Sequence, residues 1–309
     1  MTLIGVGQTE QSRQYPLHRP VFESYAASSG FDEYLHQPRA SGSSLGELMA
    51  RLSAIGLEQL NQDHRGAEQL LKRLGATFRL YNNDSQASER ILPFDPLPRL
   101  IDQQDWQRLD QGLKQRLEAI DCFLADIYGK RQILSDGVIP LEAIESSLGW
   151  RPQMQGLKPP QQRWCHISGL DLIRDGEGTW RVLEDNLRCP SGVAYFLENR
   201  RVMKQLFGDL FQRQRVAPID DYPSKLLRML KGLAPWSPEP YVVILTPGVH
   251  NSAYFEHSYL ARLMGVQLVE GSDLTCEGGK VWLRSTSGLS RVDVIYRRID
   301  DDFLDPQCF

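Results

Sequence analysis

The chain has 309 residues, of which 41% are hydrophobic and 24% are charged, and this composition is typical of a globular protein long enough for two domains. The formal net charge of -4 and the pI near 5.9 argue against a nucleic acid or an acidic membrane surface as the partner. No apolar run approaches the roughly 20 residues needed to cross a bilayer. The amino terminus shows neither a basic leader nor an apolar signal region, so the expected location is the cytoplasm.

The first third of the chain predicts an irregular start followed by helices. Residues 1–40 are rich in Gln, Ser, Pro, Arg and His, and we expect them to be extended or partly disordered. A helix is expected after Ser43, and the segment Gly75–Tyr81 indicates the end of a helix followed by a strand. From Asp105 a long helix is expected to pack one apolar face into the core, with this series of apolar residues: Trp106, Leu109, Leu113, Leu117, Ile120, Leu124 and Ile127.

The segment 166–192 carries the strongest chemical signal. The tetrad Asp175–Gly178 is a turn between two runs rich in Leu, Ile, Val and Trp, which predicts a β-hairpin. If Arg174 lies opposite Thr179, then Asp171 faces Val182 and Glu184 lies one diagonal step away on the same face, with Asn186 next along it. Two carboxylates and an amide in this arrangement predict a Mg²⁺ site, because hard divalent ions prefer such oxygens and share them with phosphates.

Two neighbouring features favour phosphate chemistry at this hairpin. Arg188 follows the acidic cluster, and Cys189–Gly192 leads into a helix that begins near Val193. A helix entered through Ser191 and Gly192 is expected to present free backbone N–H groups to an anion. The alternative is that the polar residues are solvated positions on an amphipathic hairpin.

The last part of the chain predicts a small α/β unit. The segment Ala234–Pro240 indicates a linker, and the apolar run Tyr241–Thr246 is typical of a buried parallel strand. Further strands are expected at 266–270 and 293–296, and another at 280–284. Because ligands bind at the carboxyl ends of parallel strands, the loop His250, Asn251 and Ser252 is expected at the working edge.

The same edge carries two arginines. Arg297 and Arg298 follow the expected strand 293–296, where a guanidinium can hold a carboxylate or phosphate with two hydrogen bonds. The alternative is a surface cluster of ion pairs with the neighbouring acidic residues. For His250 and Asn251 the alternative to substrate contact is a loop that caps a helix.

These patterns define the expected organisation of the chain. The fold class is α+β with a C-terminal α/β unit. The expected parts are the irregular segment 1–40, a helical and α+β region at 41–234 that contains the metal hairpin, the linker 235–240, and the α/β unit 241–309.

The quoted motifs also resemble a known family. Leu183–Gly192, preceded by Gly169–Leu172, looks like the metal-binding hairpin of ATP-grasp ligases, and the whole chain resembles the circularly permuted type 2 ATP-grasp proteins, relatives of glutathionylspermidine synthase. Further similar segments lie across the chain: 89–95, 126–129, 192–200, 245–257 and 294–306. The resemblance implies a partial, circularly permuted ATP-grasp architecture.

The family resemblance implies an ATP- and Mg²⁺-dependent ligase that activates a peptide-like or amino-acid carboxylate as an acyl phosphate and joins it to an amine. Asp171, Glu184 and Asn186 match the family's metal ligands. Many ATP-grasp ligases carry an Arg two residues before the first metal Asp, whereas this chain has Gly169. Arg188, Arg297 and Arg298 are therefore the candidates for stabilising the acyl-phosphate transition state.

The family's nucleotide-covering lysines and glycine-rich loop lie downstream of the segment that resembles Tyr296–Asp301, so the chain is expected to be a truncated form. Two alternatives to the ligase follow: a non-catalytic binding module that keeps the hairpin, and a hydrolase with paired carboxylates, in which Asn186 has no necessary role. The five cysteines show no zinc or disulfide spacing and are expected to be reduced, and a nucleophilic Cys189 is not favoured.

Overall fold

The structure is a computed structural model, and it describes residues 30–36, 43–81 and 87–304. Helices and small sheets are mixed along the chain, as expected for an α+β protein. Most of the segment 1–40, which the sequence predicts to be irregular, lies outside the described residues. The same holds for the last residues of the predicted α/β unit.

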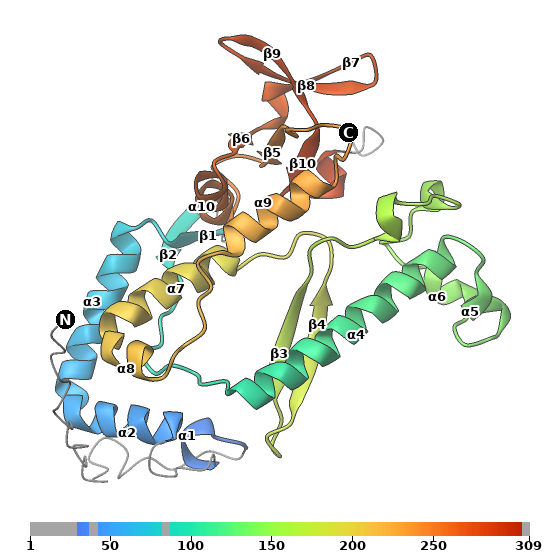
Figure 1. The fold of residues 1–309 in the computed structure, drawn as a ribbon. Coiled ribbons are helices and arrows are strands. Elements are labelled where there is room, and N and C mark those ends of the chain that lie inside the picture. The colour runs from blue at the N-terminus through green and yellow to red at the C-terminus, as the bar shows by residue number, and fades with distance from the viewer. Residues whose placement is uncertain (1–29, 37–42, 82–86, 305–309) are drawn as a thin grey trace, which may run out of the picture.

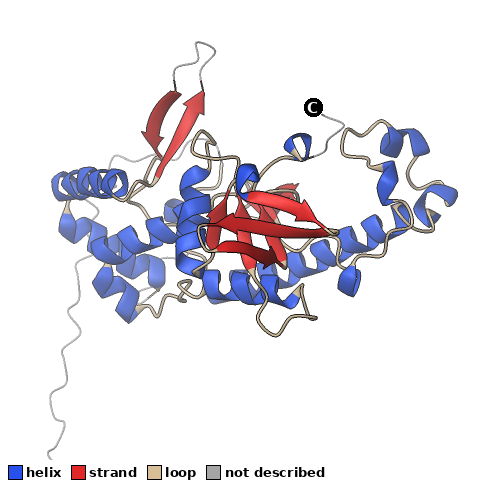
Figure 2. Ribbon diagram, turned by 90° about the horizontal axis from the view of Figure 1, so that it is seen from above, coloured by secondary structure: helices blue, strands red, loops and turns tan. Residues whose placement is uncertain are grey.

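Short helices open the described chain. The helices are α1 (Glu33–His36), α2 (Ser44–Ile55) and α3 (Leu57–Arg73). The predicted start of α2 is confirmed, because the Ser43 side chain accepts a hydrogen bond from the Gly46 N–H and so caps the helix. Strands β1 (Thr77–Tyr81) and β2 (Ala87–Ile91) then form an antiparallel hairpin that projects from the body of the molecule (Figure 2).

The long helix is α4 (Gln103–Ile127), and its predicted position is confirmed. Its predicted burial is wrong over much of its length: only Leu109, Asp121 and Ile127 are buried, and Trp106 is 57% exposed. The reason is that over most of its length α4 lies beside a two-stranded hairpin, which is too narrow to cover a whole helix face (Figure 1). Short helices follow: α5 (Gln132–Ser135), α6 (Leu141–Glu145), η1 (Pro152–Met154) and η2 (Pro160–Gln162).

The predicted hairpin is formed by β3 (Gly169–Arg174) and β4 (Trp180–Asn186), and it runs alongside α4 (Figure 1). Its turn follows the local chemistry, since one Asp175 carboxylate oxygen accepts hydrogen bonds from the N–H groups of Glu177 and Thr179. The predicted register is wrong by one residue at the turn: Arg174 pairs with Trp180, not with Thr179.

Three helices follow the hairpin. The segment predicted as one helix from Val193 is divided at Phe207 into α7 (Val193–Leu206) and α8 (Gly208–Arg213). Helix α9 (Tyr222–Gly232) comes next and lies beside the sheet of the C-terminal unit (Figure 1).

The predicted parallel sheet is present with the strand order β10–β5–β6. Its strands are β5 (Val242–Leu245), β6 (Gln267–Val269) and β10 (Val294–Arg297), and helix α10 (Tyr254–Met264) connects β5 to β6. Leu226 and Leu230 of α9 belong to the same buried cluster as Ile244 of β5 and Leu260 of α10. Residues 235–240 therefore join two parts of one hydrophobic core.

The strand predicted at 280–284 forms, but outside the parallel sheet. It is β8 (Lys280–Ser285), the central strand of a separate antiparallel sheet with β7 (Leu274–Glu277) and β9 (Gly288–Val292). Tight turns between these strands favour antiparallel pairing, whereas a parallel strand would need a longer crossover. The short helices η3 (Gly271–Asp273) and η4 (Asp301–Phe303) complete the described elements.

Candidate functional site

The predicted metal ligands lie together on the exposed face of the β3–β4 hairpin. Asp171 and Glu184 are direct cross-strand partners. The Asn186 amide Nδ2 donates to Asp171 Oδ2 at 3.2 Å and to Glu184 Oε1 at 3.0 Å. The structure thus brings together the three side chains that the sequence predicts for the metal site.

An irregularity in the hairpin produces this arrangement. Leu172 pairs with Val182 but Asp171 pairs with Glu184, so Leu183 is an extra residue in β4. Leu183 and Glu184 are both exposed, which breaks the alternation of the strand. In a regular ladder Leu183 would oppose Asp171, and Glu184 would point to the face that packs against α4. The bulge therefore sets both carboxylates on one face.

The two carboxylates perturb each other's pKa. The neighbouring Glu184 carboxylate raises the pKa of Asp171, whereas the Asn186 amide and then Asp171 lower the pKa of Glu184. A bound cation would supply positive charge to both carboxylates and so favour their ionised forms.

Ion pairs fix the opposite face of the hairpin to α4. Arg116 of α4 donates to both carboxylate oxygens of Asp185, at 2.7 and 2.6 Å. At the other end Arg174 pairs with Asp105, and its guanidinium lies 4.6 Å from the centre of the Trp180 ring. The hairpin is therefore held at both ends, with its acidic face open.

The donor set fits Mg²⁺ better than a metal held wholly by protein. Among the described residues, no group of three or more His, Cys, Asp or Glu side chains is arranged to hold a metal ion. Mg²⁺ usually keeps several waters and takes one or two carboxylates together with substrate phosphates. Asp171 and Glu184 supply those carboxylates, and rotation of the Asn186 amide would present its oxygen.

The structure explains why a glycine, and not an arginine, stands at position 169. Gly169 pairs with Asn186, so a side chain there would lie beside the metal donors. A Cβ at Gly169 would come within 2.9 Å of the Pro190 Cβ. The Cys189–Gly192 segment thus occupies the space that an arginine at this position would need.

Two of the candidate arginines form ion pairs that stay accessible. Arg188 lies 2.8 Å from Asp300, and the two side chains are 61% and 58% exposed. Arg297 pairs with Asp301, and both side chains are about one-third exposed. Exposed pairs of this kind contribute little to stability, so an anionic substrate can compete for these guanidinium groups.

Arg298 is buried and held by two other parts of the chain. Its guanidinium donates to Glu256 Oε1 at 2.9 Å and to the Pro190 carbonyl at 2.6 Å. The sequence analysis missed Glu256, which is completely buried in α10. The available signal was an acidic residue directly after the aromatic pair Tyr254 and Phe255, in the first turn of a predicted helix.

The start of α7 is occupied by the same carboxylate. Glu256 Oε2 accepts hydrogen bonds from the N–H groups of Gly192 at 2.7 Å and Ala194 at 3.0 Å. The expectation of free N–H groups here is therefore wrong for Gly192, because the protein supplies its own anion. Ser191 is exposed, and its contact with a cofactor stays a prediction.

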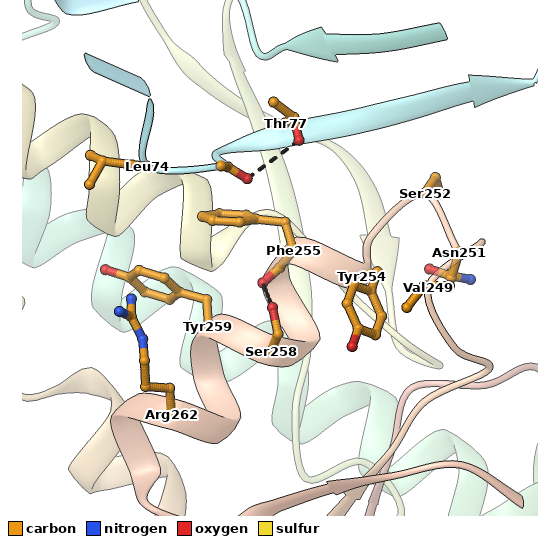
Figure 3. Close-up of a pocket in the computed structure, with 11 residues that line it drawn as sticks. Leu74, Thr77, Val249, Asn251, Ser252, Tyr254, Phe255, Ser258, Tyr259 and Arg262 are labelled. Atoms are coloured by element: carbon orange, nitrogen blue, oxygen red, sulfur yellow. Dashed lines mark hydrogen bonds between the residues drawn. The ribbon is translucent and has the colours of Figure 1, made fainter. Parts of the chain in front are cut away.

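The predicted substrate loop lies at the carboxyl end of β5. His250 and Ser252 are exposed, and the Asn251 Oδ1 accepts the Ala253 N–H at 2.9 Å in the turn that precedes α10. Asn251 and Ser252 also line a cavity of about 450 Å³ between α10 and the start of β1 (Figure 3). The residues that line it do not include His250.

Cys189 lies close to the carbonyl oxygens of Arg297 and Ile299, at 3.8 and 3.9 Å. These contacts place its thiol against the backbone that follows β10. The four described cysteines, Cys122, Cys165, Cys189 and Cys276, are all free thiols.

Comparison with known proteins gives a consistent result. Residues 98–309 match the family described as circularly permuted ATP-grasp type 2. A protein of Synechocystis sp. named as uncharacterized is 52% identical over 93% of this chain and 60% of its own length. A Mycobacterium tuberculosis protein, also named as uncharacterized, is 50% identical over 85% of this chain and 45% of its own length. The chain thus spans about half the length of these relatives.

Two further similarities concern named proteins. A Frankia alni protein that carries the name Putative glutamate–cysteine ligase 2-3 is 36% identical over 92% of this chain and 33% of its own length. The solved structure of a glutathione synthetase-like effector from Globodera pallida aligns with a TM-score of 0.52 at 12% identity, covering 80% of this chain and 59% of that one. The latter similarity concerns the fold alone. In the part of the chain that the structure describes, we find no helix that is both long and apolar enough to span a membrane.

Proposed function

Because the chain belongs to the circularly permuted ATP-grasp type 2 family, we propose that it takes part in an ATP- and Mg²⁺-dependent reaction that joins a carboxylate to an amine. The observation that carries the proposal is the direct opposition of Asp171 and Glu184, with Asn186 bridging them, on the open face of an anchored hairpin. A family resemblance without these donors would support the fold but not the chemistry.

The proposed reaction has two steps. The γ-phosphoryl group of ATP passes to the substrate carboxylate to form an acyl phosphate, and the amine then attacks the acyl carbon and releases phosphate. Catalysis of such transfers depends on positioning and on charge stabilisation. Mg²⁺ held by Asp171, Glu184 and Asn186 would neutralise the nucleotide phosphates.

The chain's own cationic groups divide into two kinds. Arg188 and Arg297 hold exposed or half-exposed aspartates and are our candidates for contact with phosphate or the substrate carboxylate. Arg298 is committed to Glu256 and Pro190, so we assign it a positioning role beside the reacting groups. Ser191 and Gly192 are proposed cofactor contacts, and His250, Asn251 and Ser252 are proposed substrate contacts.

The substrate classes follow from the relatives. We propose a peptide-like or amino-acid carboxylate and an amine, and the Frankia alni relative named as a putative glutamate–cysteine ligase supports this class. The cytoplasm, where ATP is abundant, is the proposed location.

The metal site is tested with Mn²⁺ as a spectroscopic substitute for Mg²⁺. Asp171→Asn and Glu184→Gln are each expected to weaken Mn²⁺ binding, followed by electron paramagnetic resonance, by roughly tenfold or more. Glu177→Gln is the matched control, since it removes a carboxylate from the exposed turn of the same hairpin. Equal Mn²⁺ affinity in wild type and both site variants would refute the metal site.

The nucleotide is tested separately by calorimetry. MgATP is titrated into this chain and into a form extended to the length of its relatives, and phosphate release is followed with amino acids as carboxylate and amine donors. Binding and phosphate release that both require Asp171 and Glu184 support the ligase. Mn²⁺ binding without MgATP binding in either form would instead identify a non-catalytic binding module.

A further inference from the structure

The cavity between α10 and the start of β1 lies outside the metal hairpin and has its own chemical character. Two segments far apart in the sequence build it: Leu74–Thr77 on one side, and the loop and helix face from Val249 to Arg262 on the other (Figure 3). Its volume of about 450 Å³ lies in the range of sites for small molecules.

One positive charge dominates the cavity lining. Arg262 is the only charged residue among the described residues that line the cavity. Within the described part of the chain, no carboxylate lies within ion-pair distance of Arg262, whereas Arg188, Arg297 and Arg298 each have one. A guanidinium in this state is available for a bidentate pair with a carboxylate.

The position of Arg262 is set by an aromatic wall. Its guanidinium carbon lies 5.4 Å from the centre of the Tyr259 ring, a favourable cation–π distance. Phe255 contacts the rings of Tyr259 and Tyr195, at centroid distances of 5.4 and 5.1 Å. Tyr259 itself is buried. The wall beside the charge is therefore aromatic and packed into the protein.

Polar groups lie at the opposite end of the cavity. Tyr254, Asn251 and Ser252 are grouped there, while Arg262 lies two helical turns farther along α10 (Figure 3). Eight residues of helix correspond to about 12 Å, so a ligand that uses both ends must be elongated. The Asn251 side-chain oxygen accepts the Ala253 N–H, so the Asn251 amide N–H groups can donate to a ligand.

We infer that this cavity binds an elongated organic anion: a carboxylate held by Arg262, an aromatic or branched body against Phe255 and Tyr259, and a polar group beside Asn251. The inference goes beyond the proposed reaction and does not depend on the metal hairpin. It assigns the cavity a ligand class in which charge, shape and polarity each have a named partner.

The probes are N-acetyl-phenylalanine and its neutral amide, titrated by calorimetry without ATP or metal. The acid is expected to bind about tenfold or more tightly than the amide, because only the acid forms a charge-assisted pair with the guanidinium. Arg262→Gln is expected to remove this preference, and Arg262→Lys to restore part of it.

A matched control and a blocking variant complete the experiment. Arg228→Gln removes an exposed arginine of α9 that lies outside the cavity, and it is expected to leave the affinity unchanged. Ser258→Phe fills the cavity while keeping Arg262, and it is expected to abolish binding of the acid, with thermal melting confirming that the variant folds. Equal affinities for acid and amide, an unchanged affinity in Arg262→Gln, or no binding at millimolar concentration would overturn the inference.

Discussion

Glu256 and Arg298 form an ion pair that is shielded from water. The Glu256 side chain is completely buried, and the Arg298 side chain is only 2% exposed. The pair links α10 to the end of β10. Through hydrogen bonds to Gly192 and Pro190 it also fixes the segment that follows the metal hairpin. One buried ion pair thus connects the parallel sheet to the segment that follows the β3–β4 hairpin.

Glu256→Ala is expected to lower the free energy of unfolding by about 3–5 kcal/mol, because it leaves the Arg298 charge buried and unpaired. The measurement is urea denaturation followed by circular dichroism. The double variant with Arg298→Met is expected to lose less than the sum of the single losses. Glu277→Gln, an exposed residue of β7, is the control, and a loss no larger than in this control would contradict the prediction.

Arg174→Ala is expected to weaken the docking of the hairpin more than Arg116→Ala. The Arg174 side chain is 8% exposed and lies between the Phe31 and Trp180 rings, whereas the Arg116 side chain is 46% exposed. Loss of Arg174 removes the cation beside the part-buried Asp105, which keeps only the weaker Trp180 Nε1 contact at 3.3 Å, and it costs about 3 kcal/mol. The Arg116 pair is open to solvent and contributes less. Hydrogen exchange of the β3 and β4 amides measures the difference, and equal exchange in the two variants would refute it.

Gly169→Ala is expected to cost about 1–3 kcal/mol, because its Cβ would come within 2.9 Å of the Pro190 Cβ and force the following segment to shift. Thermal denaturation measures the cost. Gly176→Ala in the turn of the same hairpin is the matched control, since an added Cβ there meets nothing within 4 Å. If both variants melt together, the close approach of Pro190 does not constrain this position.

The sequence predicted those parts of the site that depend on neighbouring residues. The turn at Asp175 and the two apolar runs define the hairpin locally. The prediction that Asp171, Glu184 and Asn186 share one face is confirmed, but the predicted pairing is wrong: Asp171 pairs with Glu184 and not with Val182, and the bulge, not period-two alternation, brings Glu184 to this face. The bulge at Leu183 was not predicted, because the pairing depends on where Arg174 and Asp185 meet α4, about 69 residues away in sequence.

Burial was the weaker part of the prediction. Periodicity identified α4, but it gave no information on how much of the helix a partner would cover, and Trp106 is exposed as a result. Periodicity also gave no reason to expect Glu256 and Arg298 to be buried. A charged side chain is buried only where a partner of opposite charge is present, and here that partner is distant in sequence. The role that we propose for Arg298 is therefore positioning rather than stabilisation of the acyl-phosphate transition state.

His257 predicts a pH dependence of stability that can be assigned to one residue. Burial, and then the nearby Arg298 charge, lower the pKa of His257 to about 3, and its Nδ1 lies 2.9 Å from the Thr246 hydroxyl. Between pH 6.5 and about 3 the unfolded chain binds a proton that the folded chain excludes, so this contribution is complete above pH 6.5 and is lost as the pH falls. The slope of the free energy of unfolding against pH approaches about 1.4 kcal/mol per pH unit in this window.

Urea denaturation between about pH 7 and pH 4 tests this assignment. His257→Gln is expected to lose the slope, whereas His166→Gln, which removes an exposed histidine, is expected to keep it. Parallel pH profiles for wild type and His257→Gln would show that the folded protein accommodates a charged His257.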